Sequence, residues 1–270
     1  MPFAKNQGAR IYWDEQGQEA PVLLIMGLGW TSAMWHRTRP ILVNHYRTIA
    51  LDNRGVGRSD APPGPYSIAL MASDTAAVLD AAGIERAHIF GVSMGGMIAQ
   101  EFALQYPERI HSLILGCTAA GGPHAVQADS EVLQALFRRG LSPDEFAESM
   151  NRFIYHSSTS RERIEEDMAL RRQWYPSDSG FMAQLQGIIG WEAYSRLPEI
   201  AAPTLVLHGD SDRLIPPING ELIAKRIPGA KLVLIPLASH IFSTDQPATT
   251  HREVLKFLSS LRSSSSTDHQ

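Results

Sequence analysis

The chain has 270 residues, of which 44% are hydrophobic and 19% charged, proportions typical of a globular protein with a substantial core. Its formal net charge of −4 argues against a basic surface for nucleic acid. No apolar run is long enough to cross a membrane, the N-terminus does not resemble a secretory signal, and the single cysteine, Cys117, excludes an internal disulfide. These features predict a cytoplasmic protein that binds neither nucleic acid nor membrane.

Short apolar runs alternate with helical patterns through the first part of the chain. Strands are expected at 10–14, 22–25, 46–51, 88–92 and 110–115, and helices at 34–43, 68–82 and 94–106. The alternation predicts an α/β fold, in which a mostly parallel central sheet is flanked by helices on both faces.

The alternation stops after residue 118 and resumes at residue 203. The intervening segment has helical patterns and no clear strand, whereas the last part again offers strands at 204–207 and 231–235 and helices at 219–226 and 249–261. We therefore expect a core in two parts, 1–118 and 198–262, interrupted by a helical cap at 119–197. The polar residues 263–270 are expected to form a disordered tail. Most aromatic residues of the cap are expected to pack in the cap's own core.

Residues 91–95 read Gly-Val-Ser-Met-Gly and lie between an expected strand and an expected helix. A serine in such a sharp turn has a strained backbone and an exposed hydroxyl at the carboxyl edge of the sheet. The flanking glycines allow the neighbouring backbone to approach closely. The five residues alone also fit a glycine-rich turn before a buried helix, but the strand-to-helix context favours Ser93 as a nucleophile.

A serine hydroxyl needs a base to remove its proton, and that base is usually a histidine oriented by a buried carboxylate. Asp212 follows the strand at 204–207, with Asp210 as the alternative acid. His240 follows the strand at 231–235 and precedes the last helix, so it is the predicted base. His208, at the end of a strand, is expected to be a hydrogen-bonded core residue.

The loop at 25–30 follows an early strand and contains Gly27 and Gly29. The backbone N–H groups of Leu28 and Met94 are expected to form an oxyanion hole. Apolar residues expected to line the substrate pocket are Trp30, Trp174, Trp191 and Ile241. The sequence has no His-x-His-x-Asp-His or His-Glu-x-x-His cluster, so neither a metal nor an organic cofactor is expected.

The order Ser93, Asp212, His240, together with the motifs at 52–60 and 91–96, resembles the α/β-hydrolase superfamily over residues 9–261. The chain is most similar to the branch of capped carboxylesterases, enol-lactonases and non-haem haloperoxidase-like proteins, some of which hydrolyse acyl-homoserine lactones. One departure is Met26-Gly27, where many relatives carry His-Gly, which changes the polarity beside the site. Asp52 and Arg54 in the motif at 52–60 are expected to be structural.

The residues and the resemblance together predict a serine esterase or lactonase that forms an acyl-enzyme with a small, largely apolar ester or lactone. Acyl-homoserine lactones are among the candidate substrates. Relatives that act on haloalkanes or epoxides carry aspartate at the nucleophile position, so Ser93 favours acyl transfer. Two alternatives stay open: a carbon–carbon bond hydrolase or perhydrolase using the same three residues, and a ligand receptor with little turnover. A monomer and a homo-oligomer both fit the sequence.

Overall fold

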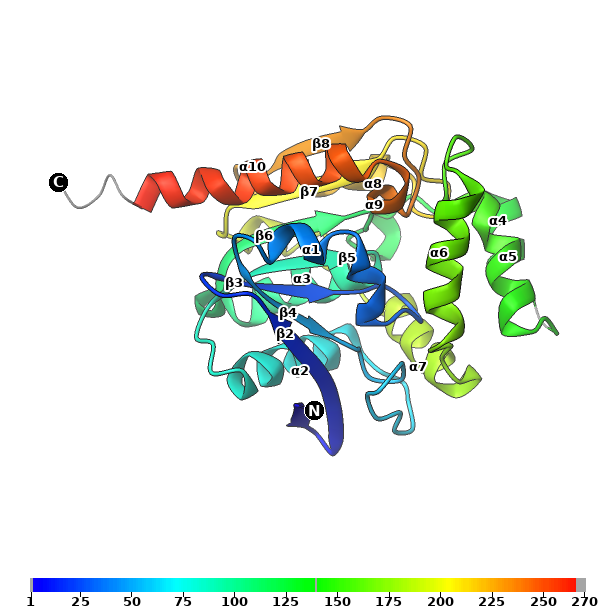
Figure 1. The fold of residues 1–270 in the computed structure, drawn as a ribbon, viewed down its shortest axis with the longest axis horizontal. Helices are drawn as coiled ribbons and strands as arrows, with labels where there is room; N and C mark the ends of the chain where they lie inside the picture. The colour runs from blue at the N-terminus through cyan, green and yellow to red at the C-terminus, as the bar shows by residue number, and fades with distance from the viewer. Residues whose placement is uncertain (1, 139, 266–270) are drawn as a thin grey trace.

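A computed structural model describes residues 2–138 and 140–265 (Figure 1). In this part of the chain, eight strands form one sheet in the order β1-β2-β4-β3-β5-β6-β7-β8. The pairings β1-β2 and β2-β4 are antiparallel, and all the remaining pairings are parallel. The strands are β1 (Phe3–Asn6), β2 (Ala9–Gln16), β3 (Pro21–Ile25), β4 (Arg47–Leu51), β5 (Ala87–Val92), β6 (Ile110–Gly116), β7 (Thr204–Gly209) and β8 (Lys231–Ile235). The predicted α/β fold class is confirmed.

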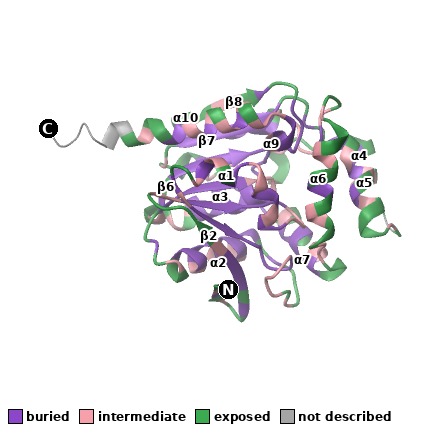
Figure 2. Cartoon of the chain, viewed as in Figure 1, coloured by how far each residue is buried: buried purple, intermediate pink, exposed green. Residues whose placement is uncertain are grey.

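The central strands are apolar throughout because both faces of the sheet are covered. In β3, Leu23 and Ile25 belong to one hydrophobic cluster, whereas Val22 and Leu24 belong to the cluster on the opposite face. Alternate side chains of a strand point to opposite faces, so a doubly covered strand needs apolar residues at every position. Figure 2 shows the resulting concentration of buried residues in the sheet.

Helices α2 (Ile68–Ala81), α3 (Met94–Gln105) and α8 (Ile218–Arg226) supply residues to one cluster. The opposite cluster receives residues from α1 (Arg39–Leu42), α9 (Phe242–Asp245) and α10 (Pro247–Ser265). Short 3-10 turns are η1 (Ser32–His36) and η2 (Pro107–Arg109).

Two expectations about element bounds need correction. The helix expected at 34–43 is divided into η1 and α1, because Pro40 has no backbone N–H and is accommodated at the start of a new helix. Helix α10 continues to Ser265, so 263–265 of the expected tail is helical, and 266–270 lies outside the described residues. Strand β1 was not expected, since its four residues, Phe-Ala-Lys-Asn, are too few to show a pattern.

Between β6 and β7 the described residues form η3 (Gly122–His124), α4 (Ser130–Leu136), α5 (Pro143–Ile154), α6 (Arg161–Arg172), α7 (Asp178–Ile189) and η4 (Leu197–Glu199). Helices α4 to α7 each begin after a side chain that accepts a hydrogen bond from the first turn, contributed by Asp129, Ser142, Ser160 and Ser177. Figure 1 shows these four helices at the end of the molecule toward which the parallel strands point. We propose that residues 119–197 form the cap of the two-part core.

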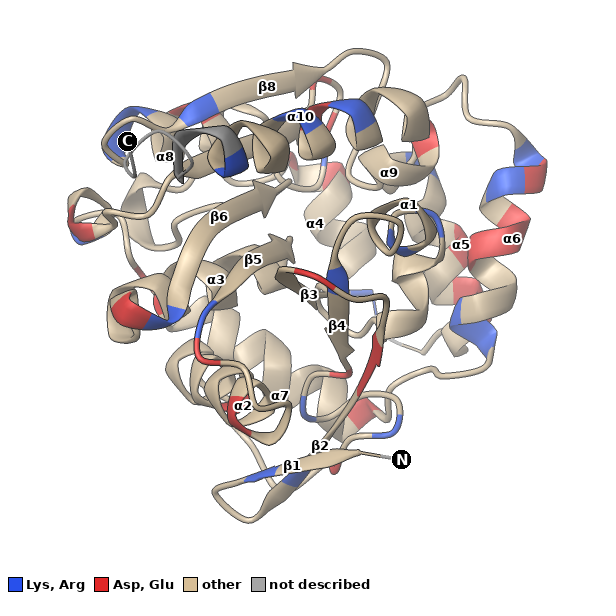
Figure 3. Ribbon diagram, turned by 60° about the vertical axis from the view of Figure 1, so that its left-hand side comes forward, with Lys and Arg blue, Asp and Glu red and all other residues tan. Residues whose placement is uncertain are grey.

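Charged residues avoid the sheet interior and are frequent on the cap. Figure 3 shows both signs of charge on α6, whereas the central strands carry almost none. Of α4 to α7, helix α6 has the most charged sequence.

Candidate active site

Ser93 occupies the sharp turn between β5 and α3, with φ 58° and ψ −123°. This left-handed conformation is strained for a residue with a Cβ atom. A Cβ atom at Gly91 would lie 2.0 Å from the carbonyl oxygen of Gly95, and one at Gly95 would lie 2.2 Å from that of Ile25. Only glycine fits at these two positions, so the motif is required for the chain to make this turn.

Asp212 and His240 lie in the loops that follow β7 and β8, respectively. Nδ1 of His240 is 2.8 Å from Oδ2 of Asp212, and both side chains are buried. Oδ1 of Asp212 accepts hydrogen bonds from the backbone N–H groups of Leu214 and Ile215, each at 2.9 Å. Asp210 is exposed and accepts a hydrogen bond from Ser211. The carboxylate that meets His240 is therefore that of Asp212.

A second buried histidine adjoins the same carboxylate. Nε2 of His208 lies 2.8 Å from the carbonyl oxygen of Ile215 and 3.5 Å from Oδ2 of Asp212. Burial raises the pKa of Asp212, but the opposing effects of His240 and His208 are larger, so the net pKa lies below its usual value. Asp212 is consequently ionised at neutral pH and can hold the His240 ring in one orientation.

Ser93 and His240 line one cavity of about 660 Å³, together with Leu28 and Met94. Within the described part of the chain, the backbone N–H groups of Leu28 and Met94 have no hydrogen-bond partner. A Cβ atom at Gly27 would lie 2.9 Å from Cβ of Ser93, so the loop that contains Leu28 approaches the serine closely. Two free N–H donors beside a serine are the elements of an oxyanion hole.

Ser93 Oγ makes no hydrogen bond to any described residue. Contacts between a nucleophile and its base are often loose without substrate and tighten in the complex. The cavity thus brings Ser93 and His240 together at one sheet edge, and Asp212 contacts the His240 ring from outside the cavity lining.

The loop that carries His240 is bonded to the end of α5. The N–H group of Ile241 donates to the carbonyl oxygen of Ile154 at 2.9 Å, and the hydroxyl of Ser239 donates to that of Phe153 at 2.9 Å. On the other side of the cavity, the N–H group of Gly29 donates to the side chain of Gln184 on α7 at 2.9 Å. Residues 119–197 therefore contact both loops that border Ser93.

Three of the four expected pocket residues, Trp30, Trp174 and Ile241, line the cavity of Ser93. Trp191 does not. It is buried, and its indole N–H donates to Oε2 of Glu101 on α3 at 2.8 Å. A buried indole N–H needs an acceptor, and the Glu101 carboxylate supplies one outside the cavity that Ser93 lines.

The expectation that most cap aromatics pack in the cap's own core is also wrong. Phe153 and Tyr155 belong to a separate buried cluster. Five aromatic cap residues line the cavity, and of these Phe146 also packs against that cluster: Phe137, Phe146, Trp174, Tyr175 and Phe181. Helical periodicity identifies an apolar face but not the surface against which that face packs.

Asp52 and Arg54 make structural contacts. Oδ1 of Asp52 accepts hydrogen bonds from the N–H group of Ser32 at 2.8 Å and from its hydroxyl at 2.7 Å. Arg54 forms a buried ion pair with Asp74 at 2.5 Å. Among the described residues, neither Asp52 nor Arg54 lines the cavity.

The sole cysteine lies close to the candidate site. Cys117 Sγ accepts a hydrogen bond from the N–H group of Gly209 at 3.4 Å. Burial raises the pKa of the Cys117 thiol well above its usual value, and the nearby Asp212 carboxylate adds to the shift. The thiol therefore stays protonated and does not compete with Ser93 as a nucleophile.

Residues 20–247 match the model of the family described as "alpha/beta hydrolase fold". The chain belongs to the α/β-hydrolase family and is a hydrolase. Within the described residues, no helix combines the length and the apolar composition needed to span a bilayer.

The similar proteins include one provisionally named as a carbamate hydrolase and two named for lactones. A protein of Azorhizobium caulinodans, provisionally named carbamate hydrolase RutD, is 31% identical and is matched over 95% of this chain and 98% of that protein. The enol-lactonase from Burkholderia xenovorans LB400 superposes with a TM-score of 0.84 at 27% identity, over 96% of this chain and 100% of that one. Est816, described as an N-acyl homoserine lactone degrading enzyme, gives a TM-score of 0.81 at 28% identity, over 95% and 100% of the chains.

Proposed function

We propose that the protein hydrolyses small carboxylic esters or lactones through an acyl-enzyme on Ser93, with His240 as base and Asp212 as its orienting carboxylate. The observation that carries this proposal is one cavity lined by Ser93 in its strained turn, by His240, whose ring contacts the buried carboxylate of Asp212, and by Leu28 and Met94 with their free N–H groups. Together these groups match the roles of nucleophile, base and oxyanion donors in acyl transfer.

In the first step His240 accepts the proton of Ser93 as the hydroxyl oxygen attacks the carbonyl carbon. The negative charge that develops on the carbonyl oxygen is stabilised by the N–H groups of Leu28 and Met94. Met94 is the first residue of α3, so the helix dipole also favours this charge. Collapse of this intermediate breaks the ester bond. His240 then donates its proton to the departing alcohol oxygen.

In the second step His240 removes a proton from water, and the resulting hydroxide attacks the acyl-enzyme. The Ser93 oxygen leaves with the proton held by His240, which restores the free enzyme. Asp212 remains ionised throughout, because two histidines and two backbone N–H groups stabilise its charge. Its task is to fix the ring orientation and to stabilise the imidazolium.

The cavity lining supports a small substrate with a substantial apolar portion. Residues of the loop after β3 and of α5 to α7 supply apolar and aromatic side chains around Ser93. The similar proteins named as an enol-lactonase and as an N-acyl homoserine lactone degrading enzyme support lactones among the substrates. The relative named as a carbamate hydrolase adds carbamates to the compounds that need testing.

The test is acid release in a pH-stat from a panel of short esters, lactones, acyl-homoserine lactones and carbamates. Wild type is compared with Ser93→Ala and with Ser211→Ala, an exposed serine at the same sheet edge. We expect Ser93→Ala to lose at least about 1,000-fold in kcat and Ser211→Ala to match wild type. A fluorophosphonate should also label wild type once, on the peptide that contains Ser93.

No acid release from any compound, with no labelling of Ser93, would overturn the proposal. Cleavage of diketones without ester hydrolysis would favour a carbon–carbon bond hydrolase that uses the same residues. Saturable ligand binding without turnover would favour a receptor.

A further inference from the structure

Arg171 lies in the last turn of α6 and lines the cavity of Ser93. Its guanidinium carbon is 4.5 Å from the ring centroid of Trp30, a residue of the loop that contains Leu28. The positive charge is therefore held over an aromatic ring beside the predicted oxyanion hole. Such a contact offsets only part of the cost of removing the charge from water.

No carboxylate pairs with Arg171 among the described residues. Its hydrogen bond goes to the sulfur of Met168 at 3.5 Å. By contrast Arg172, the next residue, pairs with Asp144 at 3.0 Å and with Glu165 at 3.5 Å. A buried or partly buried cation is normally paired, so the unpaired state of Arg171 is the exception that needs an explanation.

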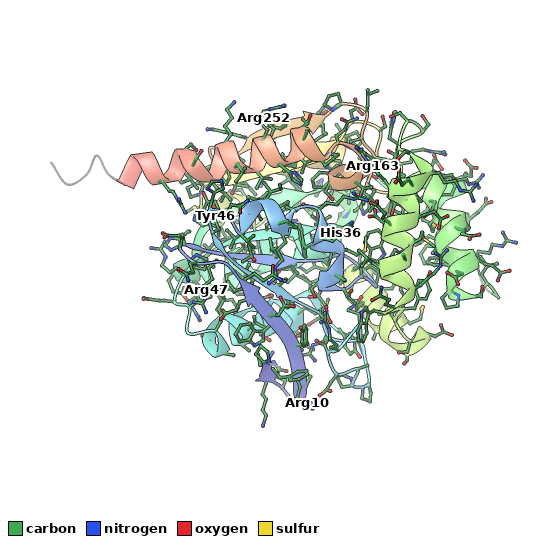
Figure 4. All side chains as sticks on the ribbon, viewed as in Figure 1. Arg10, His36, Tyr46, Arg47, Arg163 and Arg252 are labelled. Carbon is green, nitrogen blue, oxygen red and sulfur yellow. The ribbon has the colours of Figure 1, made fainter. Side chains whose placement is uncertain are left out.

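The nearest carboxylate on the same helix is already engaged. Asp167 lies one turn before Arg171 and is fully buried. Its Oδ2 accepts hydrogen bonds from the hydroxyls of Tyr155 at 3.0 Å and Thr244 at 2.7 Å. Its Oδ1 lies 3.2 Å from Nε2 of His36, which Figure 4 labels beside α6. Asp167 therefore fixes α6 against the core and forms no ion pair with Arg171, although its charge acts on the guanidinium from a longer distance.

Other charges in the cavity lining do not neutralise Arg171 either. Arg138 and Asp178 also line the cavity, but both are exposed, and Asp178 forms no ion pair with a described residue. Burial lowers the pKa of Arg171, which reports the cost of its desolvation, yet a guanidinium stays protonated in proteins. The cavity thus presents a permanent cation to whatever enters it.

We propose that Arg171 binds a carboxylate carried by the ester or lactone substrate, so that the preferred substrates are anionic rather than neutral. This inference rests on the proposed hydrolysis at Ser93. A guanidinium has five N–H donors in a planar fork that matches a carboxylate in a bidentate arrangement. The flat face of the Arg171 guanidinium lies over the Trp30 ring, so the N–H groups along its edge are the donors for the anion.

The experiment compares matched pairs of substrates that differ in charge. Monomethyl esters of succinate, glutarate and adipate carry the anion on the acyl side, and acetate esters of short hydroxy acids carry it on the alcohol side. Each is paired with an uncharged compound of similar size. The measured quantity is the ratio of kcat/KM for the anionic member to that for its neutral partner.

We expect Arg171→Met to lower this ratio about 10- to 100-fold, the range for loss of a hydrogen bond to a charged group. Arg171→Lys should recover part of the ratio, because it keeps the charge but not the fork. Arg172→Met, at the neighbouring exposed position, should leave the ratio unchanged. Circular dichroism melting curves establish that each variant is folded.

A ratio that is the same in wild type and Arg171→Met would overturn the inference, even if Ser93 hydrolyses every ester. If no ester is hydrolysed, the proposed function fails, and binding still tests Arg171. Calorimetry with monomethyl glutarate and Ser93→Ala should then show saturable binding, weakened at least about 10-fold by adding Arg171→Met. Equal binding of the neutral diester, or equal affinity without Arg171, would overturn the inference in that case.

Discussion

Oδ2 of Asp212 lies 2.8 Å from Nδ1 of His240 and 3.5 Å from Nε2 of a second buried histidine, His208. The carboxylate contacts two imidazole rings and two backbone N–H groups, since its Oδ1 also accepts hydrogen bonds from Leu214 and Ile215. Removing its charge should alter catalysis more than it alters the fold.

Replacing Asp212 with asparagine should lower kcat about 10³- to 10⁴-fold, because the amide no longer stabilises the imidazolium and favours the wrong ring tautomer. The measurement is kcat on the best ester of the panel, with thermal melting to verify the fold. Asp210→Asn is the matched control, since Asp210 is exposed two residues earlier. Equal losses for the two variants would contradict the assigned role of Asp212.

Substitution of Gly95 should strain the turn that presents Ser93. An alanine Cβ atom there would lie 2.2 Å from the carbonyl oxygen of Ile25, whereas at Gly190 the nearest atom is 3.8 Å away. We expect Gly95→Ala to destabilise the protein by about 1–3 kcal/mol or more and to lower activity, and Gly190→Ala to change stability little. Urea unfolding curves give both values. A Gly95→Ala protein as stable and active as wild type would show that the turn can relax.

Gln184 should influence catalysis without touching the reacting atoms. Its Oε1 accepts from the N–H group of Gly29, and its Nε2 donates to the carbonyl oxygen of Arg54 at 2.8 Å. Gln184→Leu leaves the buried carbonyl of Arg54 and the partly buried N–H group of Gly29 unpaired, at a cost of up to about 1–3 kcal/mol each, and frees the loop of Leu28. We expect kcat to fall about 10-fold with little change in KM, because the oxyanion donor is used mainly in the transition state.

The control for Gln184 is Gln186→Leu, an exposed position on the same helix. Steady-state kinetics on a neutral ester separate the effects on kcat and KM. A rise in KM alone would mean that Gln184 shapes the pocket rather than the oxyanion loop.

His88 should contribute to loss of stability in acid. Burial is the main cause that lowers its pKa from 6.5 to about 4, and the charges of His111 and Arg262 add to it. In the unfolded chain His88 binds a proton below about pH 6.5, whereas in the folded chain it binds one only below about pH 4. The free energy of unfolding therefore falls as pH decreases through this window. The loss is on the order of 3 kcal/mol.

Replacing His88 with asparagine should remove much of this pH dependence while keeping a polar group near Ser112, whose hydroxyl lies 2.8 Å from Nδ1 of His88. Urea unfolding between pH 7 and pH 4 measures the slope. His45→Asn, at an exposed position, should retain the wild-type slope. Identical slopes in wild type and His88→Asn would refute the assignment.

The sequence predicts candidate functional residues best where they directly follow an apolar strand. Ser93, Asp212 and His240 each follow an apolar strand, and parallel strands bring their carboxyl ends to one edge of the sheet. Gly91 and Gly95, on either side of Ser93, add a steric requirement for glycine that is visible in the motif itself. The amino-acid sequence alone therefore suffices to propose these three residues, and the distances between them give the hypothesis its geometric form.

The cap was less predictable, because its orientation depends on contacts distant in sequence. Trp191 was predicted to line the pocket, but its indole N–H donates a hydrogen bond to Glu101 on α3. Arg171 was not expected at the site, because it belongs to the highly charged segment Arg161–Arg172, which reads as a solvated helix. A signal for it existed in the apolar residues Met168 and Leu170, but the spacing alone does not indicate which charged residue turns inward.

The hydrogen bonds from Ile241 to Ile154 and from Gly29 to Gln184 join the helical insertion to two loops of the core. The insertion therefore cannot be exchanged without changing contacts of those loops. Grafting the helical segment of a relative to obtain a new substrate range would also replace the residues that support the loops of His240 and Leu28. Laboratory evolution of this scaffold should therefore meet a trade-off between specificity and rate. Compensating changes would be needed in the loops after β3 and β8.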